Sequence, residues 1–165
     1  MSFRLLHNVG DINHPNYTSK EKILNCNDVL TFDGIYRNIY ENKEMLKGKK
    51  VIFFVMGDFM GKDNSFDLAH VPKLEKYCTW DEVIEMVTEF NAELGWHTWT
   101  HRDLTTLSEE EIRKEITPPF PMKSFAFPYG KYNDLVLKLV KEQYEYAYSV
   151  FETNNTNLTI HRPYL

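Results

Sequence analysis

The sequence predicts an α/β fold in which about seven mostly parallel strands alternate with helices. Two runs, residues 29–32 and 51–56, are almost continuously apolar, as is typical of parallel strands that are covered on both faces. Stretches with helical spacing follow such runs, and two of them begin with capping boxes at Thr79 and Ser108. Strand and helix alternating at this spacing predict parallel strands joined by crossover helices.

The individual elements follow from local patterns taken in chain order. Residues 8–27 and 57–72 are rich in polar residues and contain glycine and proline, so we predict loops there. The predicted strands are residues 3–7, 29–32, 51–56, 92–96, 124–127, 146–150 and 158–162. The predicted helices are residues 36–46, which Gly48 ends, 80–90, 109–116, which Pro118 and Pro119 end, and one that Asn133 caps.

Size and composition limit the class of protein. A chain of 165 residues predicts one domain over residues 1–165. The net charge of −5 gives no basic surface for nucleic acid, so we expect no nucleic-acid partner. No apolar run is long enough to span a membrane, and we expect no membrane partner. The first residues lack a signal-peptide pattern, which predicts a cytoplasmic protein, whereas its oligomeric state stays open.

Residues that can carry chemistry follow the predicted strands. His97 and His101 lie four residues apart after one strand, Asp33 ends another, and Tyr129 follows a third. The carboxyl ends of parallel barrel strands meet on one rim, so we expect these side chains to lie together. Two imidazoles are a common half of a site for zinc, nickel or cobalt. The alternative is that the two histidines have a structural role and that their spacing is due to chance.

Four short motifs in order resemble one family. They are residues 31–34 (Thr-Phe-Asp-Gly), 53–57 (Phe-Phe-Val-Met-Gly), 97–101 (His-Thr-Trp-Thr-His) and 128–130 (Pro-Tyr-Gly). The set resembles the polysaccharide deacetylases, the NodB-homology domains of carbohydrate esterase family 4, over about residues 28–162. The resemblance implies a distorted, minimal (β/α)7-type barrel.

The resemblance also implies a metal site with one departure from the family pattern. Asp33 takes the position of the general base, and His97 and His101 take those of two metal ligands. Gly34 stands where the family has the carboxylate that completes the metal site. A divalent zinc, nickel or cobalt ion would therefore be weakly bound or absent, unless Asp33 itself becomes the third ligand. Asp58, after the next strand, is a more distant carboxylate.

Further residues take roles from the same resemblance. Pro128 and Tyr129 form the turn that binds substrate, and the amide of Tyr129 would hold the oxyanion. Arg162 is placed with them in the substrate-binding set. It would pair with Asp33 and keep it ionised; the alternative is a surface ion pair of little consequence. The general acid would be His7 on the first strand or His161 near the end of the chain, and a structural role for His7 stays open.

The resulting functional prediction is a metal-dependent hydrolase that removes an acyl group, in the first instance N-acetyl, from a carbohydrate or a related amide. The loss of the second carboxylate at Gly34 favours an alternative, a degenerate member that binds a saccharide or a partner without catalysis. A third possibility is a structural protein that has kept only the fold. Retention of Asp33 and of both histidines favours the hydrolase.

Overall fold

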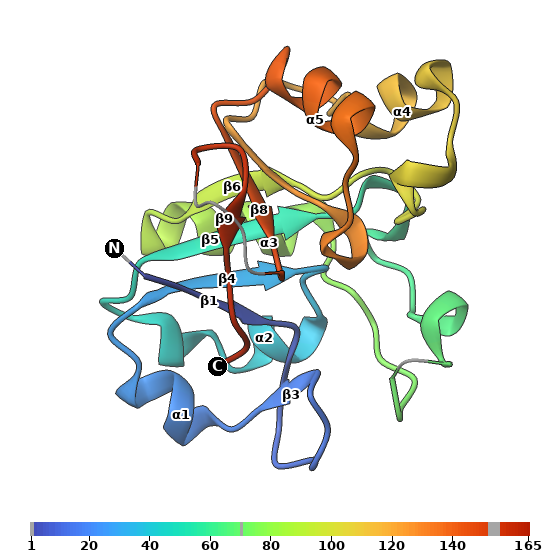
Figure 1. Cartoon of the computed structure of the whole chain (residues 1–165). Coiled ribbons are helices and arrows are strands. Elements are labelled where there is room, and N and C mark those ends of the chain that lie inside the picture. The colour runs from blue at the N-terminus through green and yellow to red at the C-terminus, as the bar shows by residue number, and fades with distance from the viewer. Residues whose placement is uncertain (1, 70, 152–155) are drawn as a thin grey trace.

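A nearly closed sheet of seven parallel strands organises the protein in a computed structural model, which describes residues 2–69, 71–151 and 156–165. The spatial order is β1-β4-β5-β6-β7-β8-β9, so each strand of this sheet pairs with the strand of the same sheet that follows it in the chain (Figure 1). The strands are β1 (Phe3–Leu6), β4 (Val29–Asp33), β5 (Val51–Val55), β6 (Glu93–Trp96), β7 (Ser124–Ala126), β8 (Tyr146–Ser149) and β9 (Ile160–His161).

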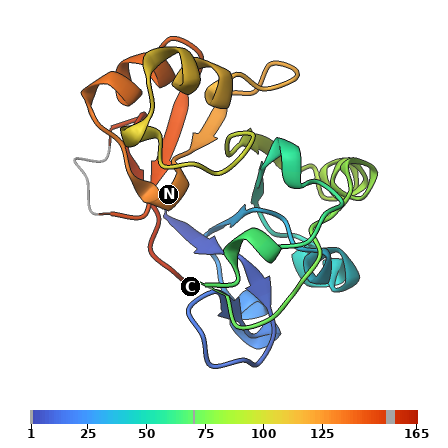
Figure 2. The same ribbon diagram turned by 90° about the vertical axis from the view of Figure 1, so that its right-hand side faces the viewer.

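The first strand meets the end of the chain, which brings the two edges of the sheet together. The amide of Leu5 donates to the carbonyl of Pro163 at 2.9 Å, and the amide of Leu165 donates to the carbonyl of Leu5 at 3.3 Å. Figure 2 shows the strands curving round with the helices outside them. The predicted distorted (β/α)7-type barrel of parallel strands is therefore confirmed.

The helices cover the outside of this curved sheet. Figure 1 shows α4 and α5 on one side of the strands, and α1 and α2 on the opposite side. The α-helices are α1 (Lys20–Asn25), α2 (Arg37–Glu41), α3 (Trp80–Phe90), α4 (Glu109–Ile116) and α5 (Asp134–Lys141). Both predicted capping boxes form, at Thr79 for α3 and at Ser108 for α4. None of these helices is both long and apolar enough to cross a lipid bilayer.

Residues 36–46 do not form the single helix that their spacing predicts. The structure has α2 followed by a 3-10 helix, η1 (Lys43–Leu46), with Asn42 between them at φ −120°. The Asn42 side-chain amide donates to the carbonyl of Asn38 at 2.7 Å. Such a local side-chain bond competes with continuation of the helix.

Two segments that we predicted as loops contain short elements and form walls beside the carboxyl ends of the strands. Residues 8–27 contain α1 and a small parallel sheet of β2 (Asn8–Val9) and β3 (Tyr17–Thr18). The segment after β5 contains η2 (Gly57–Phe59) and η3 (Ser65–Asp67). The remaining 3-10 helices are η4 (Leu104–Thr106) and η5 (Pro128–Gly130).

The core lies on both faces of the central strands. Every residue of β4 and β5 is buried, as their continuous apolar character predicts. Phe32 and Phe53 pack with ring centroids 5.7 Å apart, and Trp96 is fully buried. Asp33 is the one charged residue of β4, and it is placed at the strand's carboxyl end by this packing.

Candidate active site

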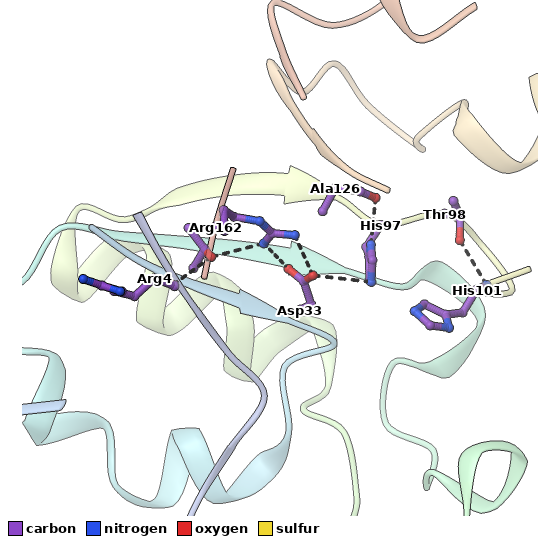
Figure 3. A network of polar contacts seen from close by, with 8 residues as sticks. Arg4, Asp33, His97, Thr98, His101, Ala126 and Arg162 are labelled. Carbon is purple, nitrogen blue, oxygen red and sulfur yellow. Dashed lines mark hydrogen bonds and ion pairs between the residues drawn. The ribbon is translucent and has the colours of Figure 1, made fainter. Parts of the chain in front are cut away.

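Polar side chains from three parts of the chain meet at the carboxyl ends of the strands. Asp33 ends β4, His97 directly follows β6, and Arg162 directly follows β9. Figure 3 shows Arg162, Asp33 and His97 in line, with His101 beyond His97. Parallel pairing of the strands brings these residues together, although they are far apart in sequence.

Asp33 is buried and held by Arg162. Nη1 of Arg162 donates to Oδ1 of Asp33 at 2.6 Å, and Nη2 donates to Oδ2 at 2.8 Å. Nη1 also donates to the hydroxyl of Thr31 at 3.1 Å, and that hydroxyl donates to the carbonyl of Arg4. Burial alone would raise the pKa of Asp33, but the guanidinium of Arg162 and then His97 hold it at about 2. Asp33 is therefore a carboxylate at neutral pH.

His97 is a buried, neutral imidazole. Its Nδ1–H donates to the carbonyl of Ala126 at 2.8 Å, which leaves the lone pair on Nε2. Nε2 lies 3.8 Å from Oδ2 of Asp33. Burial lowers the pKa of His97, although Asp33 acts in the opposite direction. A neutral imidazole whose second nitrogen is fixed by a carbonyl is typical of a metal ligand.

His101 lies on a tight turn next to His97. The two rings have centroids 4.8 Å apart at an angle of 68°. The turn is strained, because Thr98 has φ +69° and His101 has φ +55°, which non-glycine residues rarely adopt. The amide of His101 donates to the hydroxyl of Thr98 at 3.0 Å and closes the turn. On the other side of His101, the ring of Tyr129 lies 4.7 Å away.

These groups border a cavity of about 520 Å³. The predicted residues Asp33, His7, His97, His101 and Tyr129 all line it. The wall is completed by residues from the segments beside the strand ends: Leu5, His14, Pro15, Asn16, Tyr36, Met56, Phe66, Asp67, Ala69, Tyr77, Phe127, Gly130, Val150 and Tyr164.

Two residues predicted to bind substrate lie behind this wall. Arg162 is fully buried, and its guanidinium donates hydrogen bonds to Asp33 and Thr31, so it acts on the site through Asp33. The same guanidinium lies over the rings of Phe54 and Tyr148. Pro128 is buried at the start of η5 and is not among the residues that line the cavity. The pairing of Arg162 with Asp33 is internal, not a surface ion pair.

His7 lies at the end of β1 and faces the same cavity. Burial lowers its pKa to about 4, with Asp33 opposing the change. Resting His7 is thus a neutral imidazole at pH 7, and a role as acid requires that it gains a proton during the reaction. His161 lies in β9 and does not line the cavity, His14 does line it, and His70 lies outside the described residues.

Two of the three protein ligands that the family pattern requires for a divalent metal ion are present. His97 and His101 supply adjacent imidazoles, but within residues 2–69, 71–151 and 156–165 no group of three His, Cys, Asp or Glu side chains could hold a metal ion. Both oxygens of Asp33 accept hydrogen bonds from Arg162. Asp58 is exposed in η2 and does not reach the cavity wall.

The position of Gly34 explains why the carboxylate cannot simply be added. Gly34 has φ +62°, and a Cβ built on it would lie 2.7 Å from Cε of Met56 and 3.2 Å from Cε1 of Tyr77. A separation under 3.0 Å requires that Met56 moves. Met56 and Tyr77 therefore fill the space next to Gly34 toward the cavity.

Sequence patterns did not indicate the aromatic wall of the site. The rings of Tyr36 and Tyr77 pack with centroids 4.4 Å apart at an angle of 31°, and the Tyr77 hydroxyl donates to that of Tyr36 at 3.1 Å. The ring of Phe66 stacks on that of Phe59 with centroids 4.0 Å apart. Tyr77 and Phe66 lie in a polar segment without periodicity, so the sequence holds no signal for their inward orientation.

The fold and the cavity define a barrel protein with a cavity at the carboxyl ends of its strands, where barrels of parallel strands build their sites. A family model described as polysaccharide deacetylase matches residues 27–149. The chain therefore belongs to the polysaccharide deacetylase family. A Geobacillus stearothermophilus protein, described as an uncharacterized 30.6 kDa protein in the fumA 3' region, is 36% identical over 91 residues. That match covers 53% of this chain and 28% of the relative, so most of the relative lies outside the matched region.

Two solved structures share this fold. The deacetylase PplD of Streptococcus pyogenes, solved in complex with acetate, matches 100% of this chain and 92% of its own with a TM-score of 0.79 and 15% identity. IcaB of Ammonifex degensii matches 99% of this chain and 91% of its own with a TM-score of 0.77 and 16% identity. At these identities the likeness concerns the fold alone.

Proposed function

We propose that this protein hydrolyses an N-acyl group, such as N-acetyl, on a carbohydrate that binds in the cavity. One observation carries the proposal: a carboxylate held ionised by Arg162 and two adjacent imidazoles border one cavity at the strand ends. Membership of the polysaccharide deacetylase family supports this class of substrate. The sugar and its chain length are open.

Asp33 and Tyr129 have complementary roles in this proposal. Asp33 is ionised at neutral pH and accepts a proton from the attacking water. The backbone N–H of Tyr129, in the turn at φ +57°, stabilises the oxyanion of the tetrahedral intermediate. Neutral His7 takes up a proton from solvent and gives it to the leaving amine as the C–N bond breaks, and Asp33 afterwards releases the water's proton to solvent.

His97 and His101 would hold a divalent ion such as zinc, nickel or cobalt. When bound, such an ion polarises the acyl carbonyl and lowers the pKa of a water molecule. The tautomer of His97 fits this role, because the carbonyl of Ala126 fixes its other nitrogen. With only two protein ligands, the affinity for the ion would be low.

A second candidate is saccharide binding without catalysis. It is favoured by the missing carboxylate at Gly34 and by the side chains of Met56 and Tyr77 that fill the adjacent space. Aromatic rings in the wall suit a sugar ring equally well in both candidates. The two candidates differ only in whether the acyl group is released.

Acetate release from N-acetylated chito-oligosaccharides, measured with added Zn²⁺, Ni²⁺ or Co²⁺, separates the candidates. We expect release by the wild-type protein and at least a hundredfold less with Asp33→Asn, since proton transfer contributes about 10²–10⁴-fold. Calorimetry on the same oligosaccharides measures binding independently. Binding without release by the wild type would establish the second candidate and overturn the hydrolase.

A further inference from the structure

The turn that carries His101 is joined to α4 by a buried carboxylate. Glu115 is 7% exposed. Its Oε2 accepts hydrogen bonds from the backbone N–H groups of Trp99 at 3.1 Å and Thr100 at 2.9 Å. Its Oε1 accepts from the hydroxyl of Thr100. One side chain therefore satisfies three donors of the segment between the two histidines.

Two indole groups strengthen the same junction. Nε1 of Trp96 donates to the carbonyl of Glu115 at 2.9 Å, and Nε1 of Trp99 donates to the carbonyl of Thr117 at 2.8 Å. The last carbonyls of a helix have no partner within the helix. Trp96 and Trp99 supply hydrogen-bond donors for these carbonyls of α4. The end of the helix and the turn are therefore held in one arrangement.

The opposite side of the turn is held by the end of β5. The amide of Gly57 donates to the carbonyl of Thr98, and the amide of Asp58 donates to that of Trp99, each at 3.0 Å. A Cβ at Gly57 would lie 2.2 Å from Cε3 of Trp99, so only glycine permits this approach. The turn is thus held from two directions.

Such contacts are required because the turn is strained. Thr98 at φ +69° is β-branched, and His101 has φ +55°. Backbone strain of this kind persists only where the surroundings enforce it. The three hydrogen bonds that Glu115 accepts, together with those from Gly57 and Asp58, supply such surroundings.

We propose that Glu115 is a positioning residue: through the backbone of Trp99 and Thr100 it sets the turn that aims the His101 imidazole into the cavity. Glu115 does not line the cavity, so it acts only through this turn. The inference concerns the site of the proposed function, but its test needs no turnover. Failure of one therefore leaves the other standing.

The test compares Glu115→Ala, Glu115→Gln and Ser108→Ala by NMR. In the alanine variant we expect exchange of the Trp99 and Thr100 amides to accelerate about tenfold or more, relative to the His97 amide that pairs with Val55. The His101 ring signal should shift. In Glu115→Gln, which keeps one acceptor oxygen, both readouts should stay near wild type.

Ser108→Ala is the matched control, because it removes the N-cap of the same helix without a contact to the turn. It should lower the thermal midpoint and leave the His101 ring signal in place. If Glu115→Ala does not fold, Thr100→Val decides instead, since it removes one of the three donors. An unchanged His101 signal in folded Glu115→Ala or, where that variant does not fold, in Thr100→Val would overturn the proposal, and so would an equal shift in Ser108→Ala.

Discussion

The guanidinium of Arg162 and the carboxylate of Asp33 form a two-bond ion pair between positions 129 residues apart. The pair lies where the sheet nearly closes, since the next residue, Pro163, accepts a hydrogen bond from Leu5 of β1. The contact that orients the proposed base therefore also fastens the end of the chain to the barrel. Stability and chemistry depend here on the same two side chains.

Removal of Arg162 should unfold this junction. Arg162→Met leaves Asp33 buried without its partner, which costs about 3–5 kcal/mol of unfolding free energy for a pair of this kind. Urea denaturation at pH 7 measures the loss. The double variant Arg162→Met/Asp33→Asn should recover part of it, because the uncompensated charge is gone.

Arg4→Met is the matched control, because Arg4 pairs with Asp28 at the surface with the two side chains 36% and 26% exposed. An exposed pair contributes less than about 1 kcal/mol. Equal losses of unfolding free energy in the Arg162 and Arg4 variants would show that the buried pair stabilises the protein no more than the surface pair.

His7 should make the protein less stable in mild acid. Its pKa is lowered from 6.5 to about 4 by burial, so between these values the unfolded chain binds a proton that the folded protein does not. Unfolding free energy is then highest above pH 6.5 and falls toward pH 4, by up to about 3 kcal/mol for a shift of this size.

His7→Gln removes this contribution, and its unfolding free energy should change less than that of the wild type over pH 4–6.5. Denaturation at several pH values in that window gives the comparison. Other acid-sensitive groups, among them His97, remain in both proteins and cancel in the difference. Parallel curves for the two proteins would mean that His7 is not held neutral.

Gly34→Asp alone should destabilise the protein without improving metal binding. The new side chain meets both a positive φ of 62° and the Cε of Met56 at 2.7 Å. Gly48→Asp separates these effects, because Gly48 has φ +74° with no atom within 4 Å of a Cβ. We expect a lower thermal midpoint for Gly34→Asp than for Gly48→Asp.

The double variant Gly34→Asp/Met56→Ala removes the atom that obstructs the carboxylate. We expect its affinity for Zn²⁺ to exceed that of the wild type about tenfold, equivalent to about 1.4 kcal/mol. Calorimetry with Zn²⁺ measures it. An unchanged affinity in a stable double variant would show that Gly34 does not occupy the position of the family's metal carboxylate.

The strands of the barrel can be predicted from the sequence because the central strands are buried on both faces and are therefore continuously apolar. Continuous apolar runs predicted β4 and β5, and the Thr79 capping box predicted α3 with its observed bounds. The small sheet of Asn8–Val9 and Tyr17–Thr18 could not be predicted. Strands of two residues have no periodicity, and tertiary contacts such as Asn38 Nδ2 donating to Asn8 hold them.

The site was predictable only where residues follow strands. Asp33 and His97 were found because they stand at strand ends, which parallel pairing brings together. Glu115 was not found, because on a charged helix a buried glutamate has the same pattern as its exposed neighbours. Its role depends on a turn whose conformation the local sequence does not specify.

The most direct test is the metal affinity of the wild type, His97→Ala and His101→Ala. It tests whether the two imidazoles beside Asp33 are the metal ligands of the site. Isothermal titration with Zn²⁺ or Ni²⁺ gives the affinities, and circular dichroism checks that each variant is folded. We predict that the wild type binds one ion and that each variant binds it more than about tenfold less tightly, because each loses one of two protein ligands. Equal affinity in all three proteins, or no binding by the wild type, would contradict the account.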